Sequence, residues 1–338
     1  MSLENSMRRV AHYSFGSPQE VLRAEKDIPL PPLAADKVRV RLTRSMIHPA
    51  DLQVVAAHYV SSHDDIPEGR VPGMEGVGIV EEASPEALVG TGITIGTRVA
   101  FMGDGTWQTS VDLPARSLVA VPDDITDDVA TQMLLNTITA LHVLRVAKQT
   151  VGKRPTRIVL TAASSHVGKL IAVLALREGL PLICLVRSED SARRLAELLP
   201  GGEIVATETD GWQDAVRKAA SDDVPLIIDG VGGKMVTESG WLLNEGGTLV
   251  SFGLLAKGPS DMTMFLPKAL TLRGATIGTW HSETSAQDQA RDYDTAIDIA
   301  RTSPKLFDSG STFDLSDITA AVDAATSPKK QGNVLISF

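Results

Sequence analysis

The chain has 338 residues, and its 32 lysines and arginines stand against 42 aspartates and glutamates, which gives a net charge of −10. The acidic balance argues against nucleic acid as the main partner, and this length favours about two domains. The single cysteine, Cys184, excludes an internal disulfide and a cysteine-rich zinc site. No apolar run reaches membrane-spanning length and no signal peptide is recognisable, so we expect a cytoplasmic protein without a membrane partner.

The first part of the chain, residues 7–125, contains short strand patterns, prolines and glycines, and no long helical pattern. The clearest strand is expected at 37–43, where every second residue is apolar and one face is therefore buried. Residues 77–82 and 97–101 predict further strands, with glycine-rich turns between them. We therefore expect an all-β, barrel-like unit here.

From residue 126 the pattern changes to helices that alternate with buried strands, which is typical of a parallel, doubly wound sheet. Helices are expected at 129–133, 136–147, 191–199 and 212–220, and strands at 157–161, 181–186, 203–206, 226–229 and 248–252. After residue 267 the pattern is mixed, with a strand near 271, helices at 286–300 and 317–325, and a closing strand at 333–338. The order predicts a β-rich domain interrupted by an α/β domain.

Residues 155–187 predict a strand, a tight turn, a helix and a second strand, which is the βαβ unit of a dinucleotide-binding fold. Small residues in the turn let backbone amides approach a pyrophosphate at the helix N-terminus. The glycine pattern is incomplete, because Ala163 and Ser165 stand where glycines are common, and His166 precedes the one retained glycine, Gly168. A βαβ unit that binds nothing is the alternative.

Arg187 ends the second strand, nineteen positions after Gly168, where NAD-binding proteins usually carry an acidic residue. A cation at this position pairs with the 2′-phosphate of NADP(H), and Arg193 and Arg194 follow in the next helix. We therefore expect NADP(H) as the cofactor, with a solvated charge at a strand end as the alternative.

This order of elements resembles the medium-chain dehydrogenase/reductase superfamily over essentially the whole chain. The resemblance implies an α/β fold with a GroES-like β-barrel catalytic domain at 1–125 and 268–338. It also implies a doubly wound Rossmann NADP(H)-binding domain at 126–267. Ligands of open α/β sheets bind at the carboxyl ends of the strands, so we expect the active cleft between the two domains.

Zinc-dependent members of the superfamily carry a cysteine ligand in the first domain and a histidine in a following G-H-E motif. Here the corresponding loop lacks cysteine, and Met74 stands in place of that histidine. The side chains of His48, Asp51, His58 and His63 do not form a convincing tetrahedral set. We therefore expect a zinc-free reductase without a bound metal.

A more specific resemblance is to the mitochondrial-type 2-enoyl thioester reductases. Residues 48–59 match their N-P-[SA]-D-I-N-x-I-Q-G-x-Y segment in register and end on Tyr59, the residue that corresponds to the family's proton donor. Further matches are G-T-W at 105–107, V-G-G-K at 231–234 and L-R-G at 272–274. Residues 135–140, 186–187 and 252–257 resemble the family's V-N-P-x-T-A, V-V-R and Y-G-G-M-A-K.

The resemblance assigns most of the expected site. It implies cofactor contacts from Asn136, Thr139, Ser164, Ser165, His166, Val167, Arg187, Phe252, Gly253, Leu254, Leu255 and Asn333. It places His48, Asp51 and Trp280 in the substrate pocket. The alternatives are a packing role for Tyr59, a helix-capping role for Asp51, Asn136 and Thr139, and a core position for Trp280.

Four positions depart from the family. His48 replaces an asparagine, His58 directly precedes the tyrosine, His166 occupies a glycine or small-residue position, and Asn333 replaces a lysine beside the cofactor. The last substitution removes a positive charge from the expected cofactor site.

The expected reaction is the NADPH-dependent reduction of an activated C=C bond, specifically of a trans-2-enoyl thioester of coenzyme A or acyl carrier protein. A hydride goes to Cβ, and Tyr59 donates a proton to Cα, since a phenol with a pKa of about 10 is a donor at neutral pH. One alternative is a zinc-free NADPH quinone oxidoreductase, which needs no positioned proton donor. Another is a non-catalytic NADPH-binding regulatory protein. The superfamily implies a homodimer acting on a small-molecule or acyl-thioester substrate in fatty acid metabolism.

Overall fold

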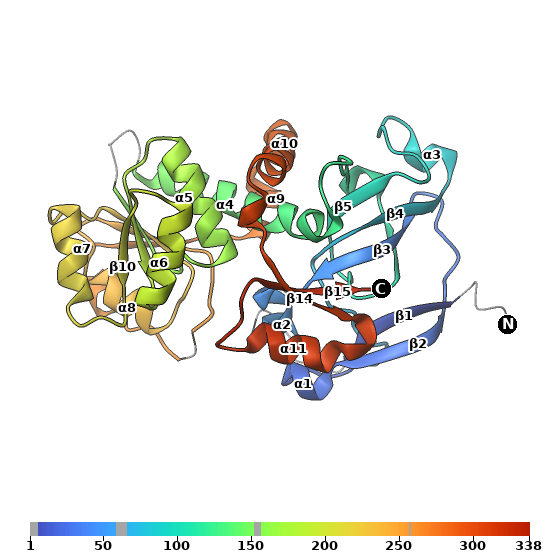
Figure 1. The fold of residues 1–338 in the computed structure, drawn as a ribbon, viewed down its shortest axis with the longest axis horizontal. Helices are drawn as coiled ribbons and strands as arrows, with labels where there is room; N and C mark the ends of the chain where they lie inside the picture. The colour runs from blue at the N-terminus through green and yellow to red at the C-terminus, as the bar shows by residue number, and fades with distance from the viewer. Residues whose placement is uncertain (1–5, 59–65, 152–156, 257) are drawn as a thin grey trace. The chain divides into compact units, whose positions relative to one another are not determined.

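The structure is a computed structural model that describes residues 6–58, 66–151, 157–256 and 258–338. Internal contacts divide the chain into unit 1, Met1–Leu135 with Tyr293–Phe338, and unit 2, Asn136–Asp292 (Figure 1). These limits differ from the predicted domain boundaries after residues 125 and 267. The second difference arises because β13 (Thr271–Gly274) pairs with a strand of the parallel sheet and so belongs to unit 2.

Unit 1 is rich in β-structure, as predicted. Its main sheet has the order β14-β15-β3-β4-β5-β7, with β6 paired to β3, and a separate two-stranded sheet joins β1 and β2. The strands are β1 (Ser6–Ala11), β2 (Arg23–Pro29), β3 (Val38–Met46), β4 (Glu75–Ala83), β5 (Arg98–Met102), β6 (Ser110–Leu113), β7 (Leu118–Ala120), β14 (Ser309–Asp314) and β15 (Asn333–Ser337). The helices are α1 (Pro18–Val21), α2 (Pro49–Val55), α3 (Pro85–Leu88) and α11 (Ile318–Thr326).

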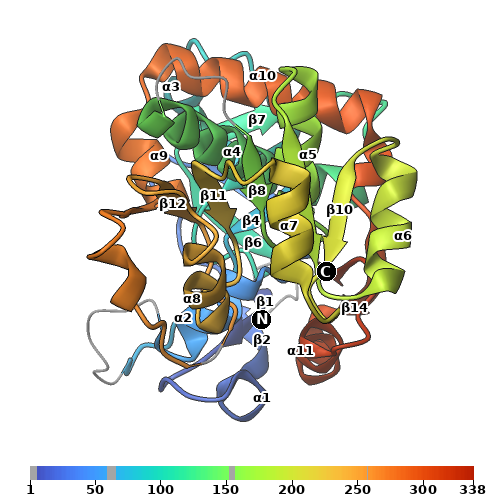
Figure 2. The same ribbon diagram turned by 90° about the vertical axis from the view of Figure 1, so that its left-hand side faces the viewer.

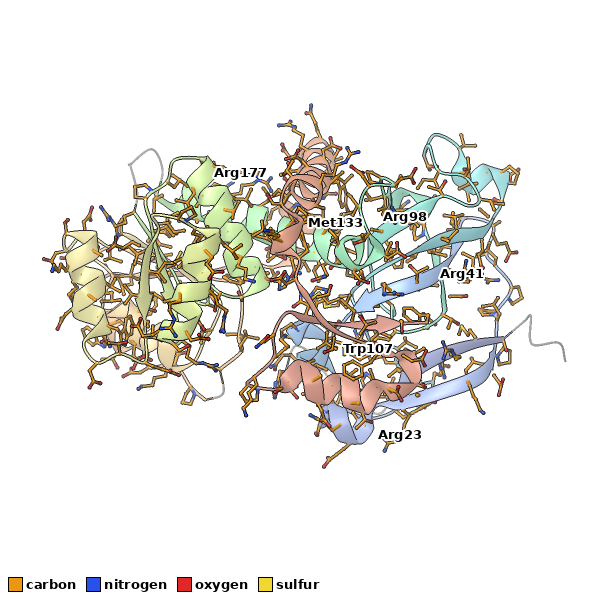
Figure 3. All side chains as sticks on the ribbon, in the orientation of Figure 1. Arg23, Arg41, Arg98, Trp107, Met133 and Arg177 are labelled. Carbon is orange, nitrogen blue, oxygen red and sulfur yellow. The ribbon has the colours of Figure 1, made fainter. Side chains whose placement is uncertain are left out.

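Trp107, from the predicted G-T-W segment, is one of the largest fully buried side chains in unit 1 (Figure 3). Its indole N–H donates a hydrogen bond to the carbonyl oxygen of Met46 over 3.4 Å. Gly73, at φ +103°, makes room for this ring, because a Cβ atom there would lie 2.5 Å from a carbon of the indole. The glycine is therefore required both for the backbone turn and for the packing of Trp107.

Unit 2 contains the predicted parallel, doubly wound sheet, and this confirms the expected α/β fold. Its strand order is β10-β9-β8-β11-β12-β13, which can be followed from β12 to β10 in Figure 2. The strands are β8 (Ile158–Leu160), β9 (Leu182–Val186), β10 (Glu203–Ala206), β11 (Leu226–Asp229), β12 (Thr248–Ser251) and β13 (Thr271–Gly274). The helices are α5 (His166–Arg177), α6 (Glu189–Leu198), α7 (Trp212–Ala220), α8 (Lys234–Gly240) and α9 (Ile277–Glu283). The strand order reverses between β8 and β11, which is where ligands of such sheets bind.

Helices cover both faces of this sheet, which explains why its strands are apolar without alternation. One buried cluster joins Val159, Ile183, Leu185, Ile227 and Leu249 of the sheet to Trp212, Val216 and Val236 of α7 and α8. Helices α5 and α6 lie on the opposite side of the sheet (Figure 1).

Helix α4 (Asp127–Val151) is continuous, whereas the sequence predicts two helices with a break near residue 134. The predicted break is occupied by Met133, Leu134 and Leu135, which are buried apolar side chains, and Met133 is labelled in Figure 3. The helix contains no glycine or proline that would end it. Helix α10 (Ala286–Thr302) closely matches its predicted range. Among the described residues, no helix combines the length and the apolar character needed to cross a bilayer.

Candidate functional site

The segment that begins at His48 starts helix α2 in unit 1. His48 is the N-cap residue, and its backbone N–H donates to Oδ2 of Asp51 over 2.8 Å. Pro49 follows at the first helical position, where its missing N–H and its fixed φ are tolerated. Asp51 is therefore a helix-start residue, which agrees with the alternative that the sequence left open for it.

The imidazole of His48 is paired with a buried carboxylate. Its Nε2 lies 3.1 Å from Oε2 of Glu75, and both side chains are almost completely buried. Burial alone lowers the pKa of His48, but the hydrogen bond to Glu75 and the charges of Asp51 and Glu75 outweigh it, so the pKa lies above its usual value. The sequence analysis did not identify this partner, although Glu75 directly follows Met74 at the position of the lost zinc ligand.

Asp51 carries a further unusual feature. Burial raises the pKa of its carboxyl group to about 7, although the neighbouring His48 opposes the shift. Its Oδ1 and the Nε2 of His12 are buried and have no hydrogen-bond partner among the described residues. Both residues line one cavity of about 40 Å³ in unit 1, which has room for a water molecule.

Tyr59, the expected proton donor, lies outside the residues that the structure describes, and so does His63. The role of Tyr59 therefore stays a prediction.

Asn333 and Trp280 are both buried. In unit 1 the amide of Asn333 donates to Oε1 of Gln132 over 2.7 Å and to the sulfur of Met46. In unit 2 the indole of Trp280 is fully buried and donates to Oδ2 of Asp292 over 2.7 Å. Asn333 thus ties structural elements together, and Trp280 is a core residue, which agrees with the alternative that the sequence left open for it. Their expected contacts with cofactor and substrate stay predictions.

The turn before α5 in unit 2 has the geometry of a nucleotide-binding turn. Ser165 is the N-cap, and its Oγ accepts a hydrogen bond from the N–H of Gly168 over 3.1 Å. Ala162 adopts φ +49°, and a Cβ atom on Gly168 would lie 2.2 Å from the carbonyl oxygen of Ala162. Strand and helix thus approach so closely that only glycine fits, and the turn leaves Ser164 exposed. This turn fits the pyrophosphate of a dinucleotide at the N-terminus of α5.

The loops that follow β11 and β12 lie against each other at the carboxyl end of the sheet. A Cβ atom on Gly253 would lie 2.6 Å from the carbonyl oxygen of Gly230, and the ring of Phe252 packs over Gly230. Leu254 and Leu255 follow as exposed apolar side chains. The expected cofactor residues of this loop are therefore close to the point where the strand order reverses.

Asp229 organises this edge of the sheet, and the sequence analysis missed it. Its buried carboxylate accepts hydrogen bonds from the N–H of Gly232 over 2.8 Å and from the hydroxyl of Thr161 over 2.6 Å. Burial raises the pKa of Asp229 above its usual value. A polar residue at the end of an apolar strand is the signal that could have identified it.

Arg187 lies at the end of β9 with its side chain 68% exposed, and its Nε is 3.6 Å from Oε1 of Glu208. Arg193 and Arg194 both pair with Asp190 in α6. The expected phosphate-binding cations are thus present and accessible, but each also has an acidic neighbour. The sequence analysis did not consider these carboxylates.

Asn136 and Thr139 lie inside α4, three residues apart and therefore on the same face of the helix. They do not open a helix, so the capping role that the sequence left open for them is excluded. His166 and Val167 form the first turn of α5 and are half-buried.

Among the described residues, no three histidine, cysteine, aspartate or glutamate side chains gather in a way that could hold a metal ion.

Two family models match separate stretches of the chain. The model described as "Alcohol dehydrogenase GroES-like domain" matches residues 34–123, which lie in unit 1. The model described as "Zinc-binding dehydrogenase" matches residues 167–292, which lie in unit 2. The second match does not include Met74 or the loop that precedes α2, so it carries no information about a zinc site.

Relatives and solved structures agree with these models. The mitochondrial enoyl-[acyl-carrier-protein] reductase of Dictyostelium discoideum is 28% identical over 312 residues, which cover 88% of this chain and 85% of that protein. The human enzyme of the same name is 27% identical over 333 residues, or 95% of this chain and 86% of that protein.

Escherichia coli quinone oxidoreductase, solved with NADPH, superposes with a TM-score of 0.82 at 20% identity, over 98% of this chain and 100% of that chain. The quinone oxidoreductase of Pseudomonas syringae pv. tomato DC3000 superposes with a TM-score of 0.82 at 24% identity and the same coverage. These matches support a zinc-free medium-chain dehydrogenase/reductase, with a GroES-like domain in unit 1 and a Rossmann domain in unit 2.

Proposed function

We propose that this protein catalyses the NADPH-dependent reduction of the C=C bond of a 2-enoyl thioester carried on coenzyme A or acyl carrier protein. The observation that carries the proposal is the similarity to mitochondrial enoyl-[acyl-carrier-protein] reductases along nearly the whole chain, 95% of it for the human enzyme. A match of this extent includes both units and the segment from His48 to Tyr59.

The residues at the edge of the unit 2 sheet fit the cofactor. The amides of residues 164–167 would hold the pyrophosphate at the N-terminus of α5, and Arg187 would pair with the 2′-phosphate. The loop of residues 252–255 would contact the nicotinamide half. Bound NADPH supplies the hydride that goes to the substrate.

The chain's own residues must stabilise charge and deliver a proton. Hydride addition to an enoyl thioester leaves negative charge on the thioester oxygen, and the enolate must then receive a proton at Cα. In the proposal Tyr59 donates this proton. Glu75 raises the pKa of His48, and the protonated imidazole would supply positive charge in the same segment and so favour the enolate.

Reduction of quinones is the second candidate. It is supported by the structural similarity to quinone oxidoreductases, one of which was solved with NADPH. This reaction needs a bound nicotinamide and an open acceptor site, but no proton donor aimed at carbon.

NADPH oxidation with crotonyl-CoA and with 9,10-phenanthrenequinone separates the candidates. Tyr59→Phe should lower crotonyl-CoA turnover by about two to four powers of ten and leave quinone turnover nearly unchanged, because only the first reaction uses a general acid. Tyr13→Phe is the matched control, since Tyr13 is exposed and its hydroxyl is bonded to Glu25.

A Tyr59→Phe variant with wild-type crotonyl-CoA turnover would remove Tyr59 from the mechanism. Turnover of the quinone alone by the wild-type protein would favour the second candidate. NADPH binding without either turnover would support the non-catalytic alternative.

A further inference from the structure

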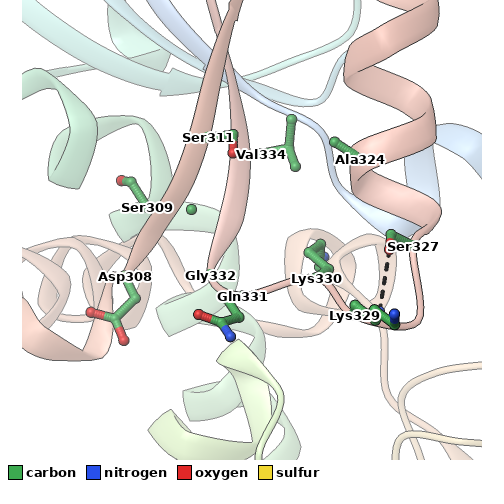
Figure 4. A pocket seen from close by; sticks show the side chains of 11 residues that line it. Asp308, Ser309, Ser311, Ala324, Ser327, Lys329, Lys330, Gln331, Gly332 and Val334 are labelled. Carbon is green, nitrogen blue, oxygen red and sulfur yellow. Dashed lines mark hydrogen bonds between the residues drawn. The ribbon is translucent and has the colours of Figure 1, made fainter.

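Unit 1 contains a polar cavity that the proposed mechanism does not use. Its volume is about 540 Å³, and it lies between β14, the end of α11 and the loop that leads into β15 (Figure 4). Two lysines, Lys329 and Lys330, line it together with the hydroxyl groups of Ser309, Ser311 and Ser327. Cationic and hydroxyl groups around one hollow are the chemistry that recognises an anion.

Close backbone packing builds this cavity. The β14–β15 register shifts at Gly310, where a Cβ atom would lie 1.8 Å from the carbonyl oxygen of Gln331. Gly332 adopts φ +69°, and a Cβ atom on it would lie 2.5 Å from the amide nitrogen of Gly310. Neither position accepts a side chain, so the loop before β15 is held tightly against the start of β14.

The lysines sit on an ordered turn. The N–H of Lys329 donates to Oγ of Ser327 over 3.2 Å, as the dashed line in Figure 4 marks. The N–H of Lys330 donates to the carbonyl oxygen of Ser327 over 3.1 Å. Ser327 directly follows α11, so the helix fixes where both lysines begin.

The two lysines have no acidic partner in the described part of the chain, where no carboxylate lies within ion-pair distance of Lys329 or Lys330. Asp308 is the acidic residue that lines the cavity, and Figure 4 places its side chain on the side away from Lys329. The cavity therefore has an excess of positive charge on the α11 side.

The environment of Lys330 also favours an anionic ligand. Burial lowers its pKa below the usual value, although the residue remains accessible to solvent. Both observations describe an ammonium group in a surface hollow. Many protein atoms surround the group, but one side of it is open to solvent. The charge of Lys330 also lowers the pKa of His48, so the two groups interact across unit 1. A partly desolvated cation without a counter-ion is stabilised by an anionic ligand.

We propose that this cavity binds a phosphate group, and that the phosphate belongs to the carrier arm of the thioester substrate. Coenzyme A and the phosphopantetheine arm of acyl carrier protein both place a phosphate at a distance from the thioester. Lys330 and Lys329 pair with the phosphate, and Ser327 donates a hydrogen bond. The assignment to the carrier rests on the proposed function, whereas phosphate binding itself does not depend on turnover.

Calorimetric titration of the NADP⁺-saturated protein tests this site without using activity. The wild-type protein should bind coenzyme A more tightly than pantetheine, which lacks the phosphates. Lys330→Gln should weaken coenzyme A binding by about tenfold, the loss expected for one charge-assisted contact, and leave pantetheine binding unchanged. Lys330→Arg should retain most of the affinity. Lys305→Gln, an exposed lysine of unit 1 outside the cavity, is the matched control.

Equal coenzyme A affinity in the wild-type and Lys330→Gln proteins, both shown to be folded by their melting temperatures, would overturn the proposal. A loss of NADP⁺ affinity in Lys330→Gln without a loss of coenzyme A affinity would show that the phosphate is the cofactor's, and would overturn the carrier assignment. If the binding results are as expected but the protein does not turn over crotonyl-CoA, the phosphate site is supported and the proposed reaction is wrong.

Discussion

Nε2 of His48 lies 3.1 Å from Oε2 of Glu75, and the other oxygen of that carboxylate accepts hydrogen bonds from the N–H groups of Leu134 and Leu135. One buried carboxylate thus pairs with the imidazole at the start of α2 and accepts hydrogen bonds from two amides inside α4. By the family resemblance, Met74 stands where zinc-dependent relatives carry a histidine ligand, and the segment that begins at His48 corresponds to the loop that carries their cysteine ligand. A hydrogen-bonded pair of side chains occupies that place in this protein.

The stability of unit 1 should depend strongly on Glu75. Glu75→Ala leaves the imidazole and two helix amides without their buried partner, so we expect the free energy of unfolding to fall by about 3–5 kcal/mol. Glu75→Gln keeps an acceptor for the amides and should cost less than half of this. Glu82→Gln, which removes the 57% exposed partner of Arg39, should cost less than about 1 kcal/mol in the same urea titrations. Similar small losses for all three variants would contradict the importance of the pair.

Asp51 should make stability depend on pH. Its pKa is about 7 in the folded protein against an ordinary value of 3.8, so between these values the folded state binds a proton that the unfolded state lacks. Its contribution to stability is therefore present at low pH and is lost as the pH rises toward 7. Asp51→Asn should gain stability relative to the wild type across this range, by up to about 1.4 kcal/mol per pH unit.

Urea titrations between about pH 4.5 and 6 measure this difference for Asp51. The pKa of His48 is raised from its ordinary value of 6.5, so the stability that His48 contributes is lost mainly above pH 6.5, outside this interval. A stability difference between Asp51→Asn and the wild type that does not change with pH would disprove the shifted titration.

Arg187 should discriminate between the two nicotinamide cofactors. Arg187→Ala removes the charge expected to face the 2′-phosphate, so the Michaelis constant for NADPH should rise about tenfold or more and that for NADH should change little. Glu208→Gln frees Arg187 from its 3.6 Å neighbour and should lower the Michaelis constant for NADPH by about two- to threefold, since an exposed pair is weak. Parallel changes for both cofactors would show that Arg187 does not face the phosphate.

Gly168→Ala should damage the turn before α5. Its Cβ atom would lie 2.2 Å from the carbonyl oxygen of Ala162, which is backbone, so the turn has to move. We expect a loss of about 1–3 kcal/mol in stability and weaker NADP⁺ binding. Gly278→Ala is the control, because the nearest atom there, Oγ1 of Thr276, is 3.6 Å away. Calorimetry should separate the two variants, and equal NADP⁺ affinities would show that the turn at Gly168 does not hold the pyrophosphate.

Much of the fold was determined locally by the sequence. The predicted ranges 203–206, 226–229 and 212–220 agree with β10, β11 and α7, because short apolar runs and helical periodicity are visible in the residues themselves. The motif at residues 164–168 likewise identified the turn before α5, since the close approach of strand and helix requires a small residue within a few positions.

The tertiary structure decided what depends on partners distant in the chain. β13 belongs to unit 2 because it pairs with β12, and α4 stays unbroken because its middle is buried. The pairing of His48 with Glu75, the acidic neighbour of Arg187 and the buried positions of Asn333 and Trp280 follow from folding, not from local spacing. A motif places a side chain on an element, but burial and the identity of its hydrogen-bond partner arise only when segments far apart in the sequence pack together.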